Sequence, residues 1–169
     1  MVDHINNSVF LLLGSNLGDS RQQLSAARLR LEQEVGKILK QSGIYKTAAW
    51  GKTDQPDFYN QVIELSTTLD AYQVLDKILS IETELGRVRE EKWGSRLIDI
   101  DILFMGEMCI DSPRLKIPHP GIAERKFTLV PLAEIAPDFH HPILNKKMFT
   151  LLRECTDPLP VEVVDSSCL

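Results

Sequence analysis

The sequence predicts an α+β fold with elements in the order β-α-β-β-α-β, helices packed on a mainly antiparallel sheet, and additions toward the C-terminal end. Three observations predict it: an apolar run at residues 9–13, two stretches with helical spacing of apolar residues, and an alternating stretch at 59–69. Hydrophobic residues make up 43% and charged residues 25% of the 169 residues, an ordinary globular balance. We therefore expect one domain over residues 1–169, with frayed ends at about 1–7 and 165–169.

The first strand and helix are marked by their boundaries. Residues 9–13 are all apolar and Gly14 follows, which is typical of a central strand buried on both faces. Apolar residues at helical spacing then predict a helix over 20–35. Ser20, followed three residues later by Gln23, has the form of a capping box with Ser20 as the N-cap.

The middle of the chain holds two more strands and a second helix. We expect one strand within residues 37–47, followed by a polar loop and then the alternating strand at 59–69. A helix over 71–85 comes next and ends at Gly86, a residue suited to the backbone turn after a helix.

The last core strand is predicted at residues 98–104 and ends at Gly106. With it, the order of elements becomes the split βαβ, ferredoxin-like pattern. Beyond this core we expect a third helix at 127–135, interrupted by Pro131, and an edge strand at 161–164.

Charge and cysteine content narrow the class of protein. The 19 Lys and Arg residues and 24 Asp and Glu residues give a net charge of −5, which argues against a general nucleic-acid or acidic-membrane binder. The three cysteines are widely spaced without a Cys-x-x-Cys pair, so we expect a reduced, cytoplasmic protein. No apolar run suits a signal peptide or a membrane span, and we expect a stand-alone domain.

Asp99 and Asp101 are the strongest candidates for a metal site. On a strand, residues i and i+2 share a face with Cα atoms about 6.6 Å apart, so the two carboxylates lie together and repel each other unless a cation binds between them. Mg²⁺ suits this place because it prefers hard oxygen ligands and retains substrate phosphates. The alternative is that both side chains face water on an edge strand. The neighbouring isoleucines and preceding arginines favour the metal site.

A basic segment precedes the aspartates and contains Arg87, Arg89, Lys92 and Arg96. Guanidinium groups match phosphate oxygens, and together with a metal face they suit polyphosphate chemistry. Arg87 and Arg89 are also explained by a solvated helix end, whereas Arg96 fits that alternative less well. The sequence has no Walker-type phosphate loop, so nucleotide binding would depend on arginines and metal.

Three further residues carry weaker signals. His119 lies between two prolines, which indicates a loop of fixed shape, and an imidazole there can reach a phosphate. Asn60 can hydrogen-bond the edge of a heterocycle, and Phe58 can stack on its face. Taken singly, each is equally explained as an ordinary loop or strand residue.

With these residues in this order, the sequence resembles the 6-hydroxymethyl-7,8-dihydropterin pyrophosphokinase family of the folate pathway. The most specific segment is 92–103, with the pattern Arg-x-x-Asp-x-Asp between hydrophobic flanks. The resemblance runs in the family's order over about residues 9–137. Its other blocks are 13–18, 45–47 with Gly51, 54–58 with Asn60, and 118–119 with Arg125 and Phe127.

The resemblance implies Mg²⁺-dependent transfer of diphosphate from ATP to the pterin hydroxymethyl group, with attack at the β-phosphorus and release of AMP. It implies that Asp99 and Asp101 hold two Mg²⁺ ions and that Asp101 helps to deprotonate the pterin hydroxyl. Arg87 and Arg96 complete the catalytic set. Glu82 contacts the ATP ribose. The implied ATP-binding residues are Glu82, Arg87, Arg89, Trp93, Arg96, Ile102, Arg114, Lys116, His119 and Arg125.

For the pterin, the resemblance implies a sandwich between Phe58 and Phe127, with Asn60 at the ring edge. The implied pterin-binding residues are Thr47, Ala48, Trp50, Phe58, Asn60, Asp99 and Phe127. This chain departs from the family in two places. Ala48 and Ala49 stand where members often have two prolines, and the loop at 89–93 is about one residue shorter.

Two other classes of protein compete with this reading. A two-metal phosphoesterase or nuclease would use the same aspartates and hydrolyse its substrate without a pterin acceptor. A ferredoxin-like RNA-recognition module would need exposed aromatics among basic residues on the sheet, where the strands instead carry Ile, Thr and Asp. We expect a monomer that binds small molecules but neither nucleic acid nor membrane, with dihydropteroate synthase as a functional neighbour.

Overall fold

The computed structural model describes residues 6–48, 55–86 and 97–165. The elements up to the last core strand are β1 (Asn7–Ser15), α1 (Ser20–Glu34), β2 (Lys37–Gln41), β3 (Ile44–Thr47), β4 (Phe58–Thr67), α2 (Ala71–Glu84) and β5 (Asp99–Met105). The elements that follow are β6 (Ile110–Asp111), β7 (Lys116–Ile117), the 3-10 turn η1 (Ile122–Glu124), α3 (Lys126–Ile135), α4 (Met148–Glu154) and β8 (Val161–Asp165).

The main sheet has six strands in the order β5-β1-β4-β3-β8, with β2 also paired to β4. All its pairings are antiparallel. The first predicted strand thus lies between the third and the fourth, and the second lies beyond the third, as in a split βαβ core. The predicted α+β, ferredoxin-like fold is confirmed. β6 and β7 form a separate hairpin.

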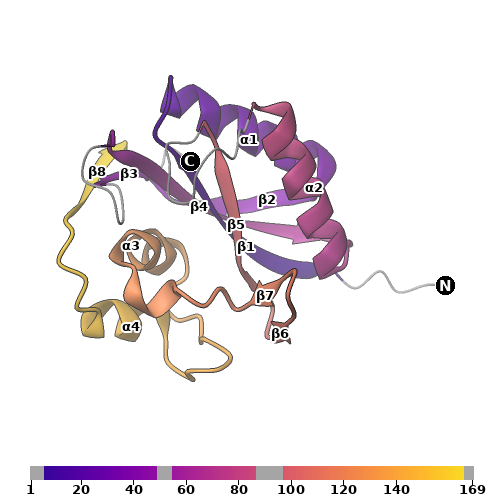
Figure 1. Cartoon of the computed structure of the whole chain (residues 1–169). Coiled ribbons are helices and arrows are strands. Elements are labelled where there is room, and N and C mark those ends of the chain that lie inside the picture. Colours follow the sequence, from indigo (N-terminus) through magenta and orange to yellow (C-terminus); the bar gives the residue numbers. More distant parts are fainter. Residues whose placement is uncertain (1–5, 49–54, 87–96, 166–169) are drawn as a thin grey trace.

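The two faces of this sheet are covered by different helices (Figure 1). Helices α1 and α2 pack on one face around Leu11, Leu13 and Ile63, whereas α3 and α4 pack on the other around Leu12 and Val62. Successive side chains of β1 therefore enter opposite cores, which explains why its apolar run is continuous. The prediction of a central strand buried on both faces is confirmed.

The predicted capping box of the first helix is wrong. Asp19 is the N-cap of α1, and its carboxylate accepts a hydrogen bond from the backbone N–H of Gln22, while Ser20 is already helical. Both residue types cap well, so sequence alone did not separate them. The capping box occurs instead at α2, where the side chains of Asp70 and Gln73 each bond to the other's backbone.

The single strand predicted within 37–47 is also wrong, because two strands occur there. At the break, the Ser42 hydroxyl accepts the N–H of Val62, and the Glu134 carboxylate accepts the N–H of Gly43. Glu134 also accepts the Tyr45 hydroxyl, and together with burial this raises the pKa of Tyr45 to about 12. Side chains thus accept backbone N–H groups at the break between β2 and β3, and Glu134 links the break to α3.

Several predicted boundaries shift by a residue or two. The third helix continues through buried Pro131, because packing against the second core offsets the missing N–H, which costs about 3 kcal/mol in a helix interior. The predicted edge strand is present as β8 and pairs with β3. Asn7 and Asp165 belong to strands, whereas residues 1–5 and 166–169 lie outside the described residues, so the frayed ends expected at about 1–7 and 165–169 stay a prediction.

Gly36 lies between α1 and β2, where the chain turns back onto the sheet, and its backbone packs closely against β4. A Cβ at this position would be 2.0 Å from the Ser66 carbonyl oxygen. Since that neighbour is backbone in β4, Gly36→Ala should lower the free energy of unfolding by about 3 kcal/mol or more, measured by urea denaturation.

Gly106→Ala is the matched control, because its φ of 53° strains any L side chain while nothing lies within 4 Å of the added Cβ. It should cost only about 1–2 kcal/mol. Equal losses in the two variants would contradict the close approach at Gly36.

Candidate functional site

The register of three neighbouring strands brings the main candidate residues into one row. Gly14 of β1 pairs with Asn60 of β4 on one side and with Asp99 of β5 on the other. Directly opposed residues of an antiparallel sheet point to the same face. Tyr45 extends the row, and its bond to Glu134 identifies this as the face covered by α3. The predicted heterocycle and metal ligands thus share one surface.

Asp99 and Asp101 lie on this face of β5 and are half-buried, whereas the isoleucines beside them point into the opposite core. The predicted juxtaposition of two carboxylates is confirmed. Among the described residues, no group of three or more His, Cys, Asp or Glu residues surrounds a common point. Two carboxylates on one face of a strand fit Mg²⁺, which binds through one or two carboxylates and takes its other ligands from phosphates and water.

Asn60 is held in one orientation by its surroundings. It is 4% exposed, and its amide N–H donates to the Thr47 hydroxyl at 3.1 Å. A Cβ on Gly14 would lie 2.9 Å from the Asn60 Oδ1 atom and 3.8 Å from the Phe58 ring. The Asn60 amide and the Phe58 ring therefore lie close to the backbone of Gly14, in space that a side chain at this position would occupy.

The loop that carries His119 is attached to β5. The His119 N–H donates to the Leu103 carbonyl at 3.0 Å, and the His119 Nδ1 atom accepts the N–H of Gly121 at 3.1 Å. Burial, reinforced by the charge of Arg125, lowers the pKa of His119 to about 4, and Asp99 opposes this only weakly. A neutral ring with Nδ1 as an acceptor carries its proton on Nε2, so His119 is a hydrogen-bond donor there.

Arg125 lies between this loop and the start of α3. A Cβ on Gly121 would be 2.8 Å from the Arg125 Nε atom, so the guanidinium group packs directly on the glycine backbone. The Arg125 Cζ atom also lies 6.0 Å from the centroid of the Phe127 ring. Phe127 in turn packs against the core that contains Leu12. A cation and an aromatic ring thus stand beside the row of strand residues.

Other predicted residues lie differently. The Ile102 side chain is 6% exposed and packs in the core on the opposite face. Arg114 and Lys116 are exposed and pair with Asp76 and Asp111 of the same chain. The loop residue Ala48 is exposed. The predicted residues Trp50, Arg87, Arg89, Trp93 and Arg96 lie outside the described residues.

Comparison with known proteins identifies the family. Residues 10–137 match the family described as 7,8-dihydro-6-hydroxymethylpterin-pyrophosphokinase (HPPK). The chain belongs to this family. It is 45% identical over 130 residues to the 2-amino-4-hydroxy-6-hydroxymethyldihydropteridine pyrophosphokinase of Methylorubrum extorquens, covering 76% of this chain and 82% of that protein. The protein of the same name from Pseudomonas aeruginosa is 43% identical over 135 residues, covering 79% and 83%.

The fold is also that of solved HPPK structures. The crystal structure of wild-type Plasmodium falciparum HPPK-DHPS with pteroate matches with a TM-score of 0.73 at 19% identity, over 89% of this chain. Our chain spans 42% of that longer chain. At this level of identity the likeness concerns the fold alone.

Two glycines of this HPPK chain were missed as site residues by the sequence analysis. The sequence indicates Gly14 as the end of a strand and as part of the resemblance block 13–18, and it gives no role for Gly121. Both act through the absence of a side chain beside Asn60 and Arg125. The signal for Gly14 was its place in the resemblance block 13–18, while Gly121 directly follows Pro118-His119-Pro120.

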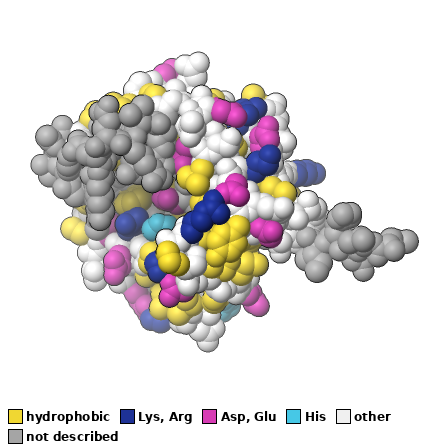
Figure 2. Space-filling model, turned by 45° about the vertical axis from the view of Figure 1, so that its right-hand side comes forward, with side chains coloured by type: hydrophobic (Ala, Val, Ile, Leu, Met, Phe, Trp, Pro, Cys, Tyr) yellow, Lys and Arg dark blue, Asp and Glu magenta, His cyan; other side chains and the backbone are white. Residues whose placement is uncertain are grey.

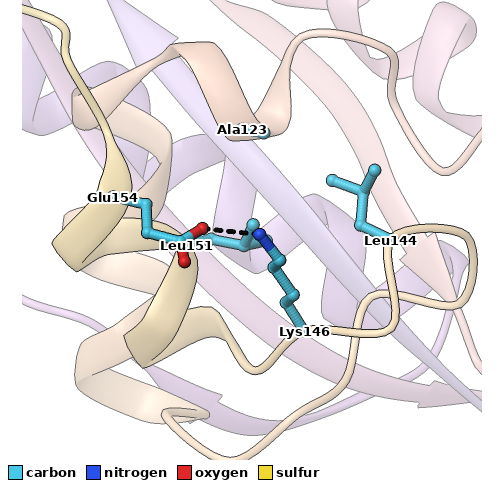
Figure 3. A pocket seen from close by; sticks show the side chains of 5 residues that line it. All are labelled: Ala123, Leu144, Lys146, Leu151 and Glu154. Atoms are coloured by element: carbon cyan, nitrogen blue, oxygen red, sulfur yellow. Dashed lines mark hydrogen bonds and ion pairs between the residues drawn. The ribbon is translucent and has the colours of Figure 1, made fainter.

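A cavity of about 250 Å³ lies away from this row, between η1, α4 and the loop before α4 (Figure 3). Ala123, Leu144 and Leu151 line it, and a Lys146–Glu154 ion pair of 2.8 Å lies across it. On the face in Figure 2, basic and acidic side chains are interspersed outside the grey atoms, without a broad basic patch. Within the described residues, no helix has the length and apolar character needed to cross a membrane.

The environment of His119 predicts its titration in the metal-free protein. We expect a neutral ring with the proton on Nε2 at pH 7 and a pKa of about 4. Since this lies below the ordinary 6.5, the unfolded chain binds the proton more readily. The stability contributed by neutral His119 is therefore complete above about pH 6.5 and is lost as the pH falls toward 4. Long-range ¹H–¹⁵N NMR measures both the tautomer and the pKa.

Two variants check the charges that act on His119. Arg125→Met removes a positive neighbour and should raise the pKa of His119, whereas Asp99→Asn removes a negative neighbour and should lower it. A ring protonated at pH 7, or one with the proton on Nδ1, would contradict the geometry of this loop.

Proposed function

We propose that the protein transfers diphosphate from ATP to the hydroxymethyl group of 6-hydroxymethyl-7,8-dihydropterin and releases AMP, a step of folate biosynthesis. Membership of the HPPK family supports this activity. The observation that carries the residue assignments is the row Asn60–Gly14–Asp99, because the proposed heterocycle ligand and the proposed metal ligand lie on the two strands that flank β1, on one face of the sheet.

The proposed cofactor is Mg²⁺, with two ions held by Asp99 and Asp101 when ATP is bound. When bound, it neutralises charge on phosphate oxygens and acts as a Lewis acid. The partial burial of both carboxylates supports this role, because each side chain keeps some exposure to solvent on the face of β5 opposite the isoleucine core.

The pterin site would form around Asn60. Phe58 lies close to Gly14, and Phe127 comes from α3, which covers the same face; the two rings would stack on the two sides of a flat heterocycle. The bond to Thr47 occupies one Asn60 donor and leaves the amide pre-oriented for the ring edge. Ala48 and Trp50 remain predicted contacts of this pocket.

The polyphosphate would extend from Asp99 toward the loop at 118–125. His119 offers its Nε2 proton without carrying charge, and Arg125 offers a guanidinium held in place by Gly121 and Phe127. Donors fixed before the reaction stabilise charge that develops on transferring phosphate at little reorganisation cost. Arg87 and Arg96 are predicted to add positive charge, and Arg89 and Trp93 to close over the nucleotide.

The reaction has a simple balance of bonds. The hydroxymethyl oxygen forms a bond to the β-phosphorus, the bond from that phosphorus to the oxygen bridging the α-phosphorus breaks, and AMP leaves with the bridging oxygen. The proton of the hydroxyl group passes to Asp101 and then to solvent. The protein contributes mainly position and electrostatic stabilisation.

The wider setting of the enzyme is proposed on less direct grounds. The Plasmodium falciparum relative carries HPPK and DHPS in one chain, which supports dihydropteroate synthase as the functional neighbour here. Within the described residues, Cys109 and Cys155 are free thiols, which is typical of a cytoplasmic protein. We propose a monomer whose ligands are small molecules, because the row of site residues comes from one chain.

The deciding experiment follows AMP formation from ATP, Mg²⁺ and the pterin. We expect AMP only when the pterin is present, and Asp99→Asn or Asp101→Asn should each reduce kcat by at least about 10³-fold, the order of effect of losing a key electrostatic group. Asp138→Asn, which changes a carboxylate 84% exposed near α4, should leave kcat unchanged.

Two results would overturn the proposal. ADP as the product would place the attack at the terminal phosphorus, and phosphate release without pterin would indicate the two-metal phosphoesterase instead. Near-normal rates in both aspartate variants would remove the metal assignment while leaving the activity in place.

A side chain at Gly14 should weaken binding of the pterin acceptor specifically. Its Cβ in Gly14→Ala would displace the Asn60 Oδ1 atom, so KM for the pterin should rise at least about tenfold, the loss of one good hydrogen bond to a substrate. KM for ATP should change less than twofold. An equal rise in KM for the pterin and in KM for ATP would show that Gly14 does not act on the acceptor site alone.

A further inference from the structure

Glu82 is a buried carboxylate beneath the strand that carries the aspartates. It lies in the last turn of α2 and is 2% exposed, whereas its neighbours Thr83 and Glu84 are exposed. Burying a carboxylate without hydrogen-bond partners costs several kcal/mol, on the order of 2–7 even for a neutral polar group. A glutamate in such a place therefore needs specific partners.

One partner is the backbone of β5. The Glu82 Oε2 atom accepts the N–H of Ile100 at 2.8 Å. Among the strands within 6–48, 55–86 and 97–165, β5 is an edge strand, so its amides that point away from β1 have no neighbouring strand there to bond. Glu82 supplies the acceptor that a further strand would have supplied.

The position of this bond along the strand gives it a second consequence. Ile100 lies between Asp99 and Asp101, and its N–H belongs to the peptide group that joins it to Asp99. Fixing that peptide plane fixes the direction of the Asp99 Cα–Cβ bond and the local twist that sets the spacing of the two carboxylates. A residue on the face covered by α1 and α2 thus controls the spacing of the two carboxylates on the face covered by α3.

We propose that Glu82 is a positioning residue for the metal-binding pair, acting through the Ile100 amide rather than by touching the nucleotide. This inference rests on the proposed function of Asp99 and Asp101. It differs from the ribose contact implied by the family resemblance, because Glu82 is 2% exposed and its Oε2 atom is bonded to the backbone of β5 from the α2 side.

Two substitutions separate the bond from the charge. Glu82→Gln keeps an oxygen at the same reach and removes the charge, whereas Glu82→Asp keeps the charge and withdraws the acceptor by one methylene. We expect the metal affinity to follow the bond. Binding of Mn²⁺ in the presence of α,β-methylene-ATP, measured by electron paramagnetic resonance, should weaken at least about tenfold in Glu82→Asp and less than threefold in Glu82→Gln.

Hydrogen exchange of the Ile100 amide gives a readout that does not depend on activity. In the metal-free protein it should be at least tenfold faster in Glu82→Asp than in wild type, and close to wild type in Glu82→Gln. Glu84→Ala is the matched control on the same helix turn, because Glu84 is exposed and pairs with Arg30. It should change neither measurement.

The ribose alternative has its own signature. If Glu82 binds a ribose hydroxyl, Glu82→Asp would lose the discrimination between ATP and 2′- or 3′-deoxy-ATP while Mn²⁺ binding stays normal, and our inference would be wrong. It would also be wrong if Glu82→Gln weakened Mn²⁺ binding as much as Glu82→Asp. A wild-type protein without pyrophosphokinase activity would contradict the proposed function alone, since Mn²⁺ binding and Ile100 exchange would still decide the role of Glu82.

Discussion

The register of β1 between β4 and β5 is the constraint on which the site depends. It places Gly14 between Asn60 and Asp99, so that an amide and a carboxylate from distant parts of the chain share one face on the two sides of β1. A slip of one residue in either pairing would turn the polar side chains into the core packed by α1 and α2. The buried alternation of β1 forbids that slip, because Leu11 and Leu13 require one face and Leu12 the other.

The loop between β7 and α3 provides the other half of the site by a different principle. It has little regular structure, and its side chains are oriented by backbone contacts: His119 by the N–H of Gly121, and Arg125 by the glycine surface itself. Regular strands thus hold the proposed metal and heterocycle ligands, and a short loop attached to Leu103 holds the proposed phosphate ligands. Both parts meet because the loop is bonded to the same strand that bears the aspartates.

Sequence reasoning found what depends on local period and missed what depends on register. The shared face of Asp99 and Asp101 follows from the two-residue repeat of a single strand, so it could be predicted. The row through Gly14 depends on how three strands align, which the sequence of each strand alone does not specify. Asp19 and Ser20 compete as caps, and the break at Ser42 depends on Glu134, which is remote in sequence. Glutamate is a residue type usually found at the surface, and the burial of Glu82 follows from its bond to the Ile100 amide, which its sequence neighbours do not predict.

The contact between Glu134 and the break after β2 bears on which acceptors fit. Glu134 binds both Gly43 and Tyr45, so α3 is attached to the strand that carries Thr47. Phe127 lies on α3, and Phe58 of β4 is paired with β3. These contacts therefore limit how far the two side chains can move relative to each other. With Phe58 and Phe127 on either side of the acceptor, as proposed, this limit would select for molecular thickness: the site would accept one flat ring system and reject puckered or bulky analogues, whatever hydrogen bonds they offer.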